Sequence, residues 1–336
     1  MGLPLIGITM GDPVGIGPEI IIKALSKQDI HHMCQPLIIG DETALNMAIN
    51  ILGSHLKIRV TEDIGGEKYE PEWINLYRVS RISPEHLSFG QPTGESSRYM
   101  VMYIKEGTHL ALEGKISALV TCPINKEAMN LAGFGYSGHT ELLAELTGAR
   151  EYAMMFVSPS LRVVLVTIHC ALCEVVKRLT AKAILSKIKI THQTLKDYFG
   201  IKNPKIAVAA LNPHGGEGGL FGKEEERIIR PAIQQANKMG IDTIGPLPSD
   251  SLFHQAIKGI YDVVVCMYHD QGLIPIKLLH FFEAVNVTLG LPIIRTSVDH
   301  GTAYDIAGKG IANPSSLISA VRLATNMVYG KGGYSG

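Results

Sequence analysis

Charged side chains are scarce in this sequence, and neither sign is in excess. Lys, Arg, Asp and Glu make up 18% of the 336 residues, against about 25% in a typical soluble protein. The 31 basic residues equal the 31 acidic ones, so the formal net charge at pH 7 is zero. Nucleic-acid binding needs a basic excess, so we expect no nucleic-acid partner. No apolar run approaches the ~18 residues of a membrane span, and we expect a globular protein with a large core and no membrane contact.

Cysteine is also scarce, with five residues in the whole chain. An odd number in a chain of this length indicates reduced thiols rather than a disulfide framework. Cys170 and Cys173 have the C-x-x-C spacing of half a zinc site or of a redox pair, but the sequence has no second such pair. We therefore interpret both as thiols in the core or facing a helix. The run 3–9 begins without a basic region or a cleavage site before it, so we expect a cytoplasmic protein.

Short β-rich apolar runs alternate with amphipathic segments along the chain. The runs that predict strands are 5–9, 35–40, 118–121, 163–168, 206–210, 263–267 and 285–288. The segments that predict helices are 18–25, 43–52, 98–112, 181–199, 223–239 and 315–329. Strand followed by helix, repeated, is typical of an α/β fold with a mostly parallel sheet and helices on both faces.

In such a fold the chemistry lies at the carboxyl ends of the strands. His169, His214 and His269 each follow a different predicted strand. Three neutral imidazoles can bind Zn²⁺ or another divalent ion and leave one position open for a substrate oxygen. Asp250 and Asp270 could orient such ligands or act as a base. The alternative is that three unrelated histidines lie on separate loops.

The glycine-rich segment 11–19 precedes a predicted helix. This arrangement favours a backbone that approaches a ligand, or an anion at the helix N-terminus. Its glycines stand at 11, 15 and 17 with Pro13 among them, so the segment is neither a dinucleotide-binding fingerprint nor a P-loop. A tight turn with Pro18 at the first helical position explains part of the pattern.

Other polar residues stand where an anion could bind. Thr140 could cap a helix start, and the N–H groups beside it could bind phosphate or carboxylate, although a cap alone is the simpler alternative. Lys277 and Arg295 are embedded in apolar sequence. A buried cation needs an anionic partner, either an internal carboxylate or an anionic substrate.

The most specific stretch is 299–314, Asp-His-Gly-Thr-Ala-Tyr-Asp-Ile-Ala-Gly-Lys-Gly-Ile-Ala-Asn-Pro. It resembles the adenine-binding loop of the isopropylmalate and isocitrate dehydrogenases. The whole chain resembles a sister of that group, the 4-hydroxythreonine-4-phosphate dehydrogenase family. The motifs that carry this resemblance are 11–13, 15–19, 138–141, 211–214, 268–272, 286–292 and 295–302.

The resemblance implies a two-lobed α/β/α fold and assigns roles to individual residues. It places a divalent metal, Zn²⁺ before Mg²⁺ or Co²⁺, on His169, His214 and His269. It implies NAD or NADP as cofactor and a homodimer with a shared active site. The implied substrate contacts are His139, Thr140, Lys277, Asn286 and Arg295. The implied cofactor contacts are His300, Gly301, Asp305 and Asn313.

The implied reaction oxidises the C3 hydroxyl of 4-hydroxy-L-threonine 4-phosphate and then releases CO₂, on the route to pyridoxal phosphate. A divalent metal would acidify the hydroxyl and stabilise the enolate, and the base is Lys277, Asp250 or Asp270. Segment 281–286 and the cysteines after His169 differ from the biosynthetic members. An alternative is therefore a 4-phospho-D-threonate or 4-phospho-D-erythronate dehydrogenase of sugar-acid breakdown. A more remote alternative is a metal-dependent hydrolase or a phosphate-binding module, which has no use for loop 300–313.

The resemblance also implies that the chain crosses twice between its lobes. We expect residues 1–125 and 275–336 to form a cofactor-side lobe. Residues 126–274 then form a lobe for the metal, the substrate and dimerisation.

Overall fold

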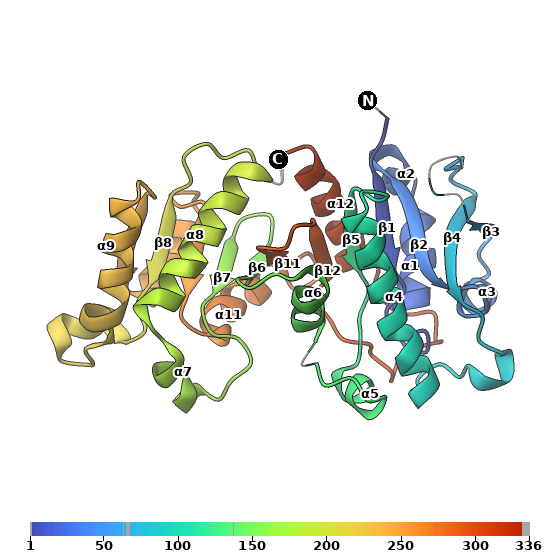
Figure 1. Cartoon of the computed structure of the whole chain (residues 1–336), viewed down its shortest axis with the longest axis horizontal. Coiled ribbons are helices and arrows are strands. Elements are labelled where there is room, and N and C mark those ends of the chain that lie inside the picture. Colours follow the sequence, from blue (N-terminus) through green and yellow to red (C-terminus); the bar gives the residue numbers. More distant parts are fainter. Residues whose placement is uncertain (1, 63, 65–67, 137, 331–336) are drawn as a thin grey trace. The chain divides into compact units, whose positions relative to one another are not determined.

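The computed structural model describes residues 2–62, 64, 68–136 and 138–330 (Figure 1). The chain forms two compact units. Unit 1 comprises Met1–Ala149 and Leu291–Tyr329, and unit 2 comprises Arg150–Gly290 together with Gly330. In the part of the chain that the structure describes, no helix has the length and apolar character needed to cross a membrane.

In unit 1 the strands lie in the order β3-β4-β2-β1-β5-β12, and each neighbouring pair is parallel. The strands are β1 (Leu5–Thr9), β2 (Gln35–Asp41), β3 (Lys57–Thr61), β4 (Trp73–Ser80), β5 (Ala118–Thr121) and β12 (Arg295–Val298). The helices are α1 (Gly17–Leu25), α2 (Gln28–Met33), α3 (Glu42–Leu52), η1 (Pro84–His86), α4 (Gly94–Leu112), α5 (Lys126–Leu131), α6 (His139–Thr147) and α12 (Ser315–Val328).

In unit 2 the order is β11-β6-β7-β10-β8-β9. Strand β6 is antiparallel to both of its neighbours, whereas β7, β10, β8 and β9 run parallel. The strands are β6 (Ala153–Val157), β7 (Arg162–Leu165), β8 (Ile206–Ala209), β9 (Thr243–Leu247), β10 (Val263–Cys266) and β11 (Val285–Leu289). The helical segments are α7 (Leu172–Arg178), α8 (Ala181–Asp197), η2 (Pro213–Gly219), η3 (Glu225–Ile229), α9 (Arg230–Lys238), α10 (Ser249–Ala256) and α11 (His269–His280). The predicted α/β class with mostly parallel strands is confirmed.

Alternation along the strands of unit 1 decides which side chains face which helices. Thr9 of β1 faces α4, because a Cβ on Gly107 of α4 would lie 3.0 Å from Thr9 Cγ2. Thr296 of β12 faces the other way and donates from Oγ1 to the Ala320 carbonyl oxygen of α12 at 2.9 Å. Its neighbour Arg295 therefore lies on the α4 face of the sheet.

The core of unit 2 is also built where one face of the sheet packs against helices. Apolar side chains of β6, β7, β8 and β10 pack against α10 and α11 in one buried cluster. The cluster contains Met154, Phe156, Leu161, Val163, Leu165, Ala207, Ala209, Leu252, Ala256, Val264, Cys266, Leu273, Ile276 and Ala284. It fixes the ends of β7, β10 and β8, where the predicted metal ligands follow.

The changes between the units fall at 149/150 and 290/291, later than the expected 125/126 and 274/275. Residues 126–149 stay with unit 1 because α5 and α6 pack on α4. Residues 275–290 stay with unit 2 because α11 packs on β7 and β10, and β11 pairs with β6. The functions assigned to the two lobes stay predictions.

Candidate active site

The three predicted metal ligands of unit 2 follow neighbouring parallel strands. His169 comes after β7, His269 begins α11 directly after β10, and His214 follows β8. Since β10 pairs with both β7 and β8, the three strands end at one edge of the sheet. The rings of His169 and His269 lie 5.8 Å apart, centroid to centroid.

This pair fits a divalent ion. An imidazole centroid lies about 3.2 Å from an ion bound at its nitrogen, because a Zn–N bond is about 2.1 Å long. Two imidazoles on one ion then have centroids roughly 5 to 6 Å apart. Asp270 Oδ1 lies 2.8 Å from His269 Nδ1, a contact that fixes the ring and leaves Nε2 as the nitrogen for a metal ion.

His214 does not join this pair in the described part of the chain, where no three His, Cys, Asp or Glu side chains form a ready metal-binding group. Its side chain is 69% exposed and lies 3.8 Å from Glu217, Nδ1 to Oε2. Its ring lies 6.2 Å from that of Phe221. The backbone of His214 has φ 54°, in a turn whose residues 214–218 all have positive φ. The three-histidine site stays a prediction.

Two buried side chains that the sequence analysis missed organise this edge. Gln271 Oε1 accepts from the Met267 N–H at 2.6 Å, and its Nε2 donates to the Ala210 carbonyl oxygen at 2.6 Å and to Ser249 Oγ at 2.8 Å. It thereby ties the end of β10 to the end of β8. Its place in the Tyr-His-Asp-Gln-Gly motif was the available signal.

Glu225 does the same for the turn that carries His214. Its Oε1 accepts from the N–H groups of Leu211 and Asn212 at 2.9 and 2.7 Å, and its Oε2 accepts from Asn212 Nδ2 at 2.9 Å. The carboxylate is 2% exposed. No local pattern in the sequence points to Glu225, because it acts on residues 13 and 14 positions away.

The three candidate bases lie in different surroundings. Asp250 is exposed at the start of α10 and accepts from the Ser251 N–H at 2.9 Å. Asp270 has a side chain that is 71% exposed beside His269. Lys277 is half-buried on α11, with Nζ 5.7 Å from the ring centroid of Phe281. The structure does not rank them.

Asn286, a predicted substrate contact on β11, carries a buried polar atom. Its Oδ1 is inaccessible to water and has no hydrogen-bond partner among the described residues. A buried oxygen without a hydrogen-bond partner lowers the stability of the fold, and the role of Asn286 as a substrate contact stays a prediction.

In unit 1, the predicted substrate contacts His139 and Arg295 form a cationic cluster with Lys126. His139 begins α6, and its Nε2 is buried without a partner among the described residues. Burial, and then the charges of Arg295 and Lys126, hold the pKa of His139 well below its usual value, so the ring is neutral at pH 7. Arg295 is 2% exposed and donates from Nη2 to Thr121 Oγ1 at 2.6 Å. Burial lowers the pKa of Arg295 to about 9, which leaves it charged at pH 7.

Thr140 is buried inside α6 and is not its cap. The cap position belongs to Gly138, which has no side chain to bind the first N–H groups. Its φ of 159° is one that residues with a side chain rarely adopt, and this accounts for a glycine at the cap position. The first turn of α6 therefore begins beside the cationic cluster without a side-chain cap.

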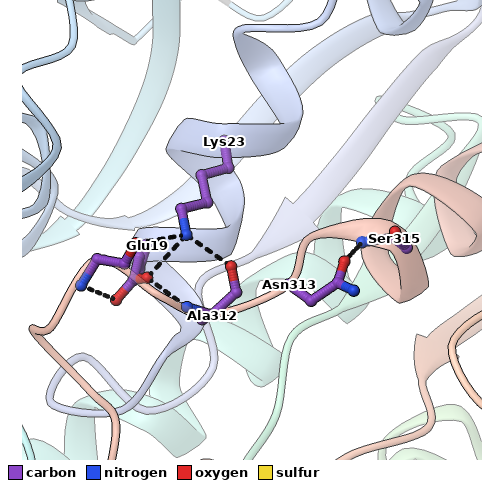
Figure 2. Close-up of polar contacts among 6 residues, drawn as sticks. Glu19, Lys23, Ala312, Asn313 and Ser315 are labelled. Atoms are coloured by element: carbon purple, nitrogen blue, oxygen red, sulfur yellow. Dashed lines mark hydrogen bonds and ion pairs between the residues drawn. The ribbon is translucent and has the colours of Figure 1, made fainter.

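Loop 300–313, the predicted cofactor contact, also belongs to unit 1. His300 Nδ1 lies 3.1 Å from the Gly301 carbonyl oxygen, and Gly301 and Asp305 are exposed. Asn313 Oδ1 accepts from the Ser315 N–H at 2.9 Å at the start of α12 (Figure 2). Tyr304 donates to Asp12 Oδ2 at 2.5 Å and lines a cavity of about 340 Å³ with Pro92, Thr93, Gly94, Ser97, Asn125, Glu127 and Ala128.

The cysteines are free thiols of two kinds. Cys34, Cys122 and Cys266 are buried, and burial raises the pKa of Cys34 to about 12 and those of the other two thiols further. Cys170 is half-buried and Cys173 is exposed on α7. The prediction of core positions for this pair is wrong, because only Val175 of the short helix α7 is buried.

These features define a class of protein: an α/β enzyme with a cationic cluster in one unit and paired imidazoles in the other. Comparison with known proteins gives the family. Residues 32–324 match the family described as pyridoxal phosphate biosynthetic protein PdxA, and the chain belongs to this family. The resemblance stated from the sequence is confirmed.

Named relatives cover nearly the whole chain. A 4-hydroxythreonine-4-phosphate dehydrogenase of Desulforapulum autotrophicum is 53% identical over 96% of this chain and 94% of its own length. A D-threonate 4-phosphate dehydrogenase of Cupriavidus necator is 46% identical over 95% of this chain and 96% of its own. The crystal structure of a 4-hydroxythreonine-4-phosphate dehydrogenase from Burkholderia phymatum matches with a TM-score of 0.86 and 44% identity, over 97% of this chain and 99% of that one. The chain is thus an oxidoreductase of the dehydrogenase type.

Proposed function

We propose that this protein oxidises the C3 hydroxyl of 4-hydroxy-L-threonine 4-phosphate, with NAD or NADP as the hydride acceptor. The observation that carries the proposal is the cluster of His139, Lys126 and Arg295 at the uncapped start of α6, in a chain of the PdxA family. A buried guanidinium is a strong partner for a phosphate. The relatives with the higher identities bear the name of this activity.

A second substrate is 4-phospho-D-threonate. It is favoured by the relatives named D-threonate 4-phosphate dehydrogenase at 46–47% identity. The two substrates share the phosphate and the C3 hydroxyl but differ at C2, where one has an ammonium and the other a hydroxyl group. The phosphate-binding cluster serves both equally.

We propose that His169, His269 and His214 hold a divalent metal, Zn²⁺ in the first place. When bound, it supplies a Lewis acid that favours the ionised C3 hydroxyl and the enolate left by loss of CO₂. Asp270 holds the ring of His269, and Gln271 holds the strand ends that carry the ligands.

The remaining steps fall to side chains of this chain. One of Lys277, Asp250 and Asp270 takes the proton of the C3 hydroxyl as the hydride leaves C3 for the nicotinamide. Thr140, Lys277 and Asn286 orient the substrate, since Asn286 offers its unpartnered Oδ1. Loop 300–313 holds the cofactor through His300, Gly301, Asp305 and Asn313. The ketone formed is a β-keto acid, and it loses CO₂.

We also propose that the enzyme is a cytoplasmic homodimer whose active site includes residues of both subunits. Exposed apolar side chains on α11 support this assembly.

The proposal is tested by the initial rate of NADH or NADPH formation with zinc-loaded protein on both substrates in parallel. We expect turnover of the amino substrate, loss of turnover after EDTA treatment, and recovery with Zn²⁺. Arg295→Met is expected to lower kcat/KM at least about 100-fold, since a charged hydrogen bond to phosphate is lost from a buried site. Arg322→Met, at an exposed position on α12, is the matched control.

Each other outcome has a defined meaning. Preference for 4-phospho-D-threonate would make the protein a catabolic dehydrogenase. Reduction of neither cofactor with either substrate would contradict the proposal and favour a hydrolase or a phosphate-binding module. Turnover that survives EDTA would remove the metal from the mechanism.

A further inference from the structure

We propose that Glu19 and Lys23 of α1 are positioning residues that hold loop 300–313 in the shape that binds the cofactor. The inference rests on the proposed function only in taking this loop as a cofactor contact. The two side chains themselves lie behind the loop and bind its backbone.

The contacts form a two-residue clamp on the backbone of Gly310 and Ala312, and Figure 2 shows the contacts to Ala312. Glu19 accepts from the Ala312 N–H at 2.7 Å through Oε1 and from the Gly310 N–H at 3.3 Å through Oε2. Lys23 Nζ donates to the carbonyl oxygens of Gly310 and Ala312 at 2.9 and 2.7 Å. The same Nζ lies 3.1 Å from Glu19 Oε1. The backbone N–H and the carbonyl oxygen of Gly310, and those of Ala312, are therefore all bound by side chains of α1.

The position of the clamp makes these bonds strong. Glu19 and Lys23 are four residues apart, so they lie on the same face of α1. The Glu19 side chain is 3% exposed and that of Lys23 is 23% exposed. Hydrogen bonds to charged groups gain strength where water is excluded.

The loop needs such support because it has no helix or strand of its own between 299 and 314. Its first part is held by the same N-terminal segment, since the Ile16 N–H donates to the Thr302 carbonyl oxygen at 3.1 Å and Tyr304 donates to Asp12. The clamp holds its last part, immediately before Asn313. Segment 12–23 thus contacts the loop near both of its ends, and a Cβ on Gly15 would lie 3.1 Å from the Thr302 carbonyl oxygen, so this close approach accounts for a glycine at position 15.

The expected consequence is a selective change in cofactor affinity. Without Lys23 the carbonyl oxygens of Gly310 and Ala312 lose their donor and Glu19 loses its counter-charge. The segment before Asn313 then samples other shapes, and cofactor binding must reorder it. The proposed metal ligands belong to unit 2, whereas Glu19, Lys23 and the loop belong to unit 1, so we expect metal binding to be unaffected.

The test compares Lys23→Met, Lys23→Arg and Glu19→Gln with a matched control, Lys27→Met. Lys27 loses the same charge, and like Lys23 it lines a cavity of about 730 Å³ beside α1, but no bond joins its side chain to the loop among the described residues. Binding of NADH and of NADPH to the full-length protein is measured by fluorescence titration. Steady-state KM and kcat are measured for cofactor and phosphorylated substrate.

We expect Lys23→Met and Glu19→Gln to raise the cofactor Kd and KM about tenfold, the usual scale for a charged hydrogen bond. The kcat at saturating cofactor and the KM for the phosphorylated substrate should stay within about twofold of wild type. Lys23→Arg should recover most of the affinity, and Lys27→Met should match wild type.

The outcomes separate the two proposals. Cofactor affinity unchanged in Lys23→Met, or equally reduced in Lys27→Met, overturns the clamp while the proposed function stands. Parallel loss of kcat and of affinity for both ligands means a purely structural role and also overturns it. A wild-type protein that binds neither nucleotide overturns both proposals. If Glu19→Gln does not fold, the Lys23 variants at their partly exposed position decide the matter.

Discussion

Burial makes His139 a neutral side chain next to two positive charges. Its pKa is held well below the ordinary value by desolvation first, and then by Arg295 and Lys126. A neutral ring can share a hydrogen with a phosphate oxygen without adding a third charge to the cluster. In the proposed phosphate site, His139 would therefore contribute a neutral hydrogen-bonding group, and Arg295 would contribute the positive charge.

This depressed pKa predicts how stability depends on pH. The unfolded chain binds a proton at His139 below about pH 6.5, the usual value for histidine, while the folded chain does not. The free energy of unfolding thus keeps this contribution fully above that pH and loses it as the pH falls through and below it. We expect the free energy of unfolding, measured with urea at pH 7.5, 6.5 and 5.5, to fall less with decreasing pH in His139→Asn than in the wild type.

The control for this experiment is His254→Asn, because His254 is exposed on α10. The free energy of unfolding of this variant should fall with decreasing pH as much as that of the wild type. Equal declines in His139→Asn and wild type would show that the ring titrates normally in the folded protein.

At the scale of elements, Gln271 joins two strand ends whose residues lie far apart in the chain. The hydrogen bond from its side-chain amide to the Ala210 carbonyl oxygen joins residues that are 61 positions apart. We expect Gln271→Leu to lower the free energy of unfolding by about 1–3 kcal/mol, because the Met267 N–H is left buried without an acceptor. We also expect weaker Zn²⁺ binding, because His269 is two residues from Met267 and its ring is positioned from there.

The measurements are urea unfolding and competition for Zn²⁺ with a chelating dye. Gln255→Leu is the matched control, since Gln255 accepts from Tyr261 on the exposed surface of the same unit. Loss of stability with Zn²⁺ affinity unchanged would show that Gln271 supports the fold but not the metal site.

The elements found from the sequence are those whose pattern is local. Nearly continuous apolar strands such as β1 and β10 were predictable because burial on both faces favours apolar residues at successive positions. Strand β3, Lys-Ile-Arg-Val-Thr, was missed because it is an edge strand with charged residues at alternate positions. Strand β6 was missed because its methionines are not typical of strands.

The candidate site shows the same limit. Histidines after strand ends could be predicted, since topology alone brings such positions to one edge. The clamp of Glu19 and Lys23 could not be predicted from the sequence. Lys23 binds residues 287 and 289 positions away, and no local pattern indicates such a contact. Glu225 could not be predicted for the same reason. Its carboxylate accepts from the backbone N–H groups of Leu211 and Asn212, which are distant in the chain.

At the scale of the whole molecule, the surface of α11 is unusually apolar. Ile274, Leu278 and Phe282 are 64%, 84% and 57% exposed, and Phe281 beside them is 62% exposed. Ile274 and Leu278 are four residues apart on one face of α11, and Phe281 and Phe282 follow directly after its last residue, His280. An exposed apolar stripe of this kind marks an interaction surface, and a second copy of the chain is the partner that the proposed homodimer requires.

The stripe predicts the assembly state and links it to activity. Sedimentation equilibrium of the wild-type protein should give the mass of two chains, and a Leu278→Glu, Phe282→Glu double variant should give the mass of one, because four buried carboxylates cannot be desolvated at a paired interface. The double variant should also lose turnover, since the proposed active site includes both subunits. Leu112→Glu, at a single 46% exposed apolar position at the end of α4, should stay dimeric and active. A wild-type mass of one chain would contradict the dimer, and a monomeric variant with full turnover would show that each chain carries a complete site.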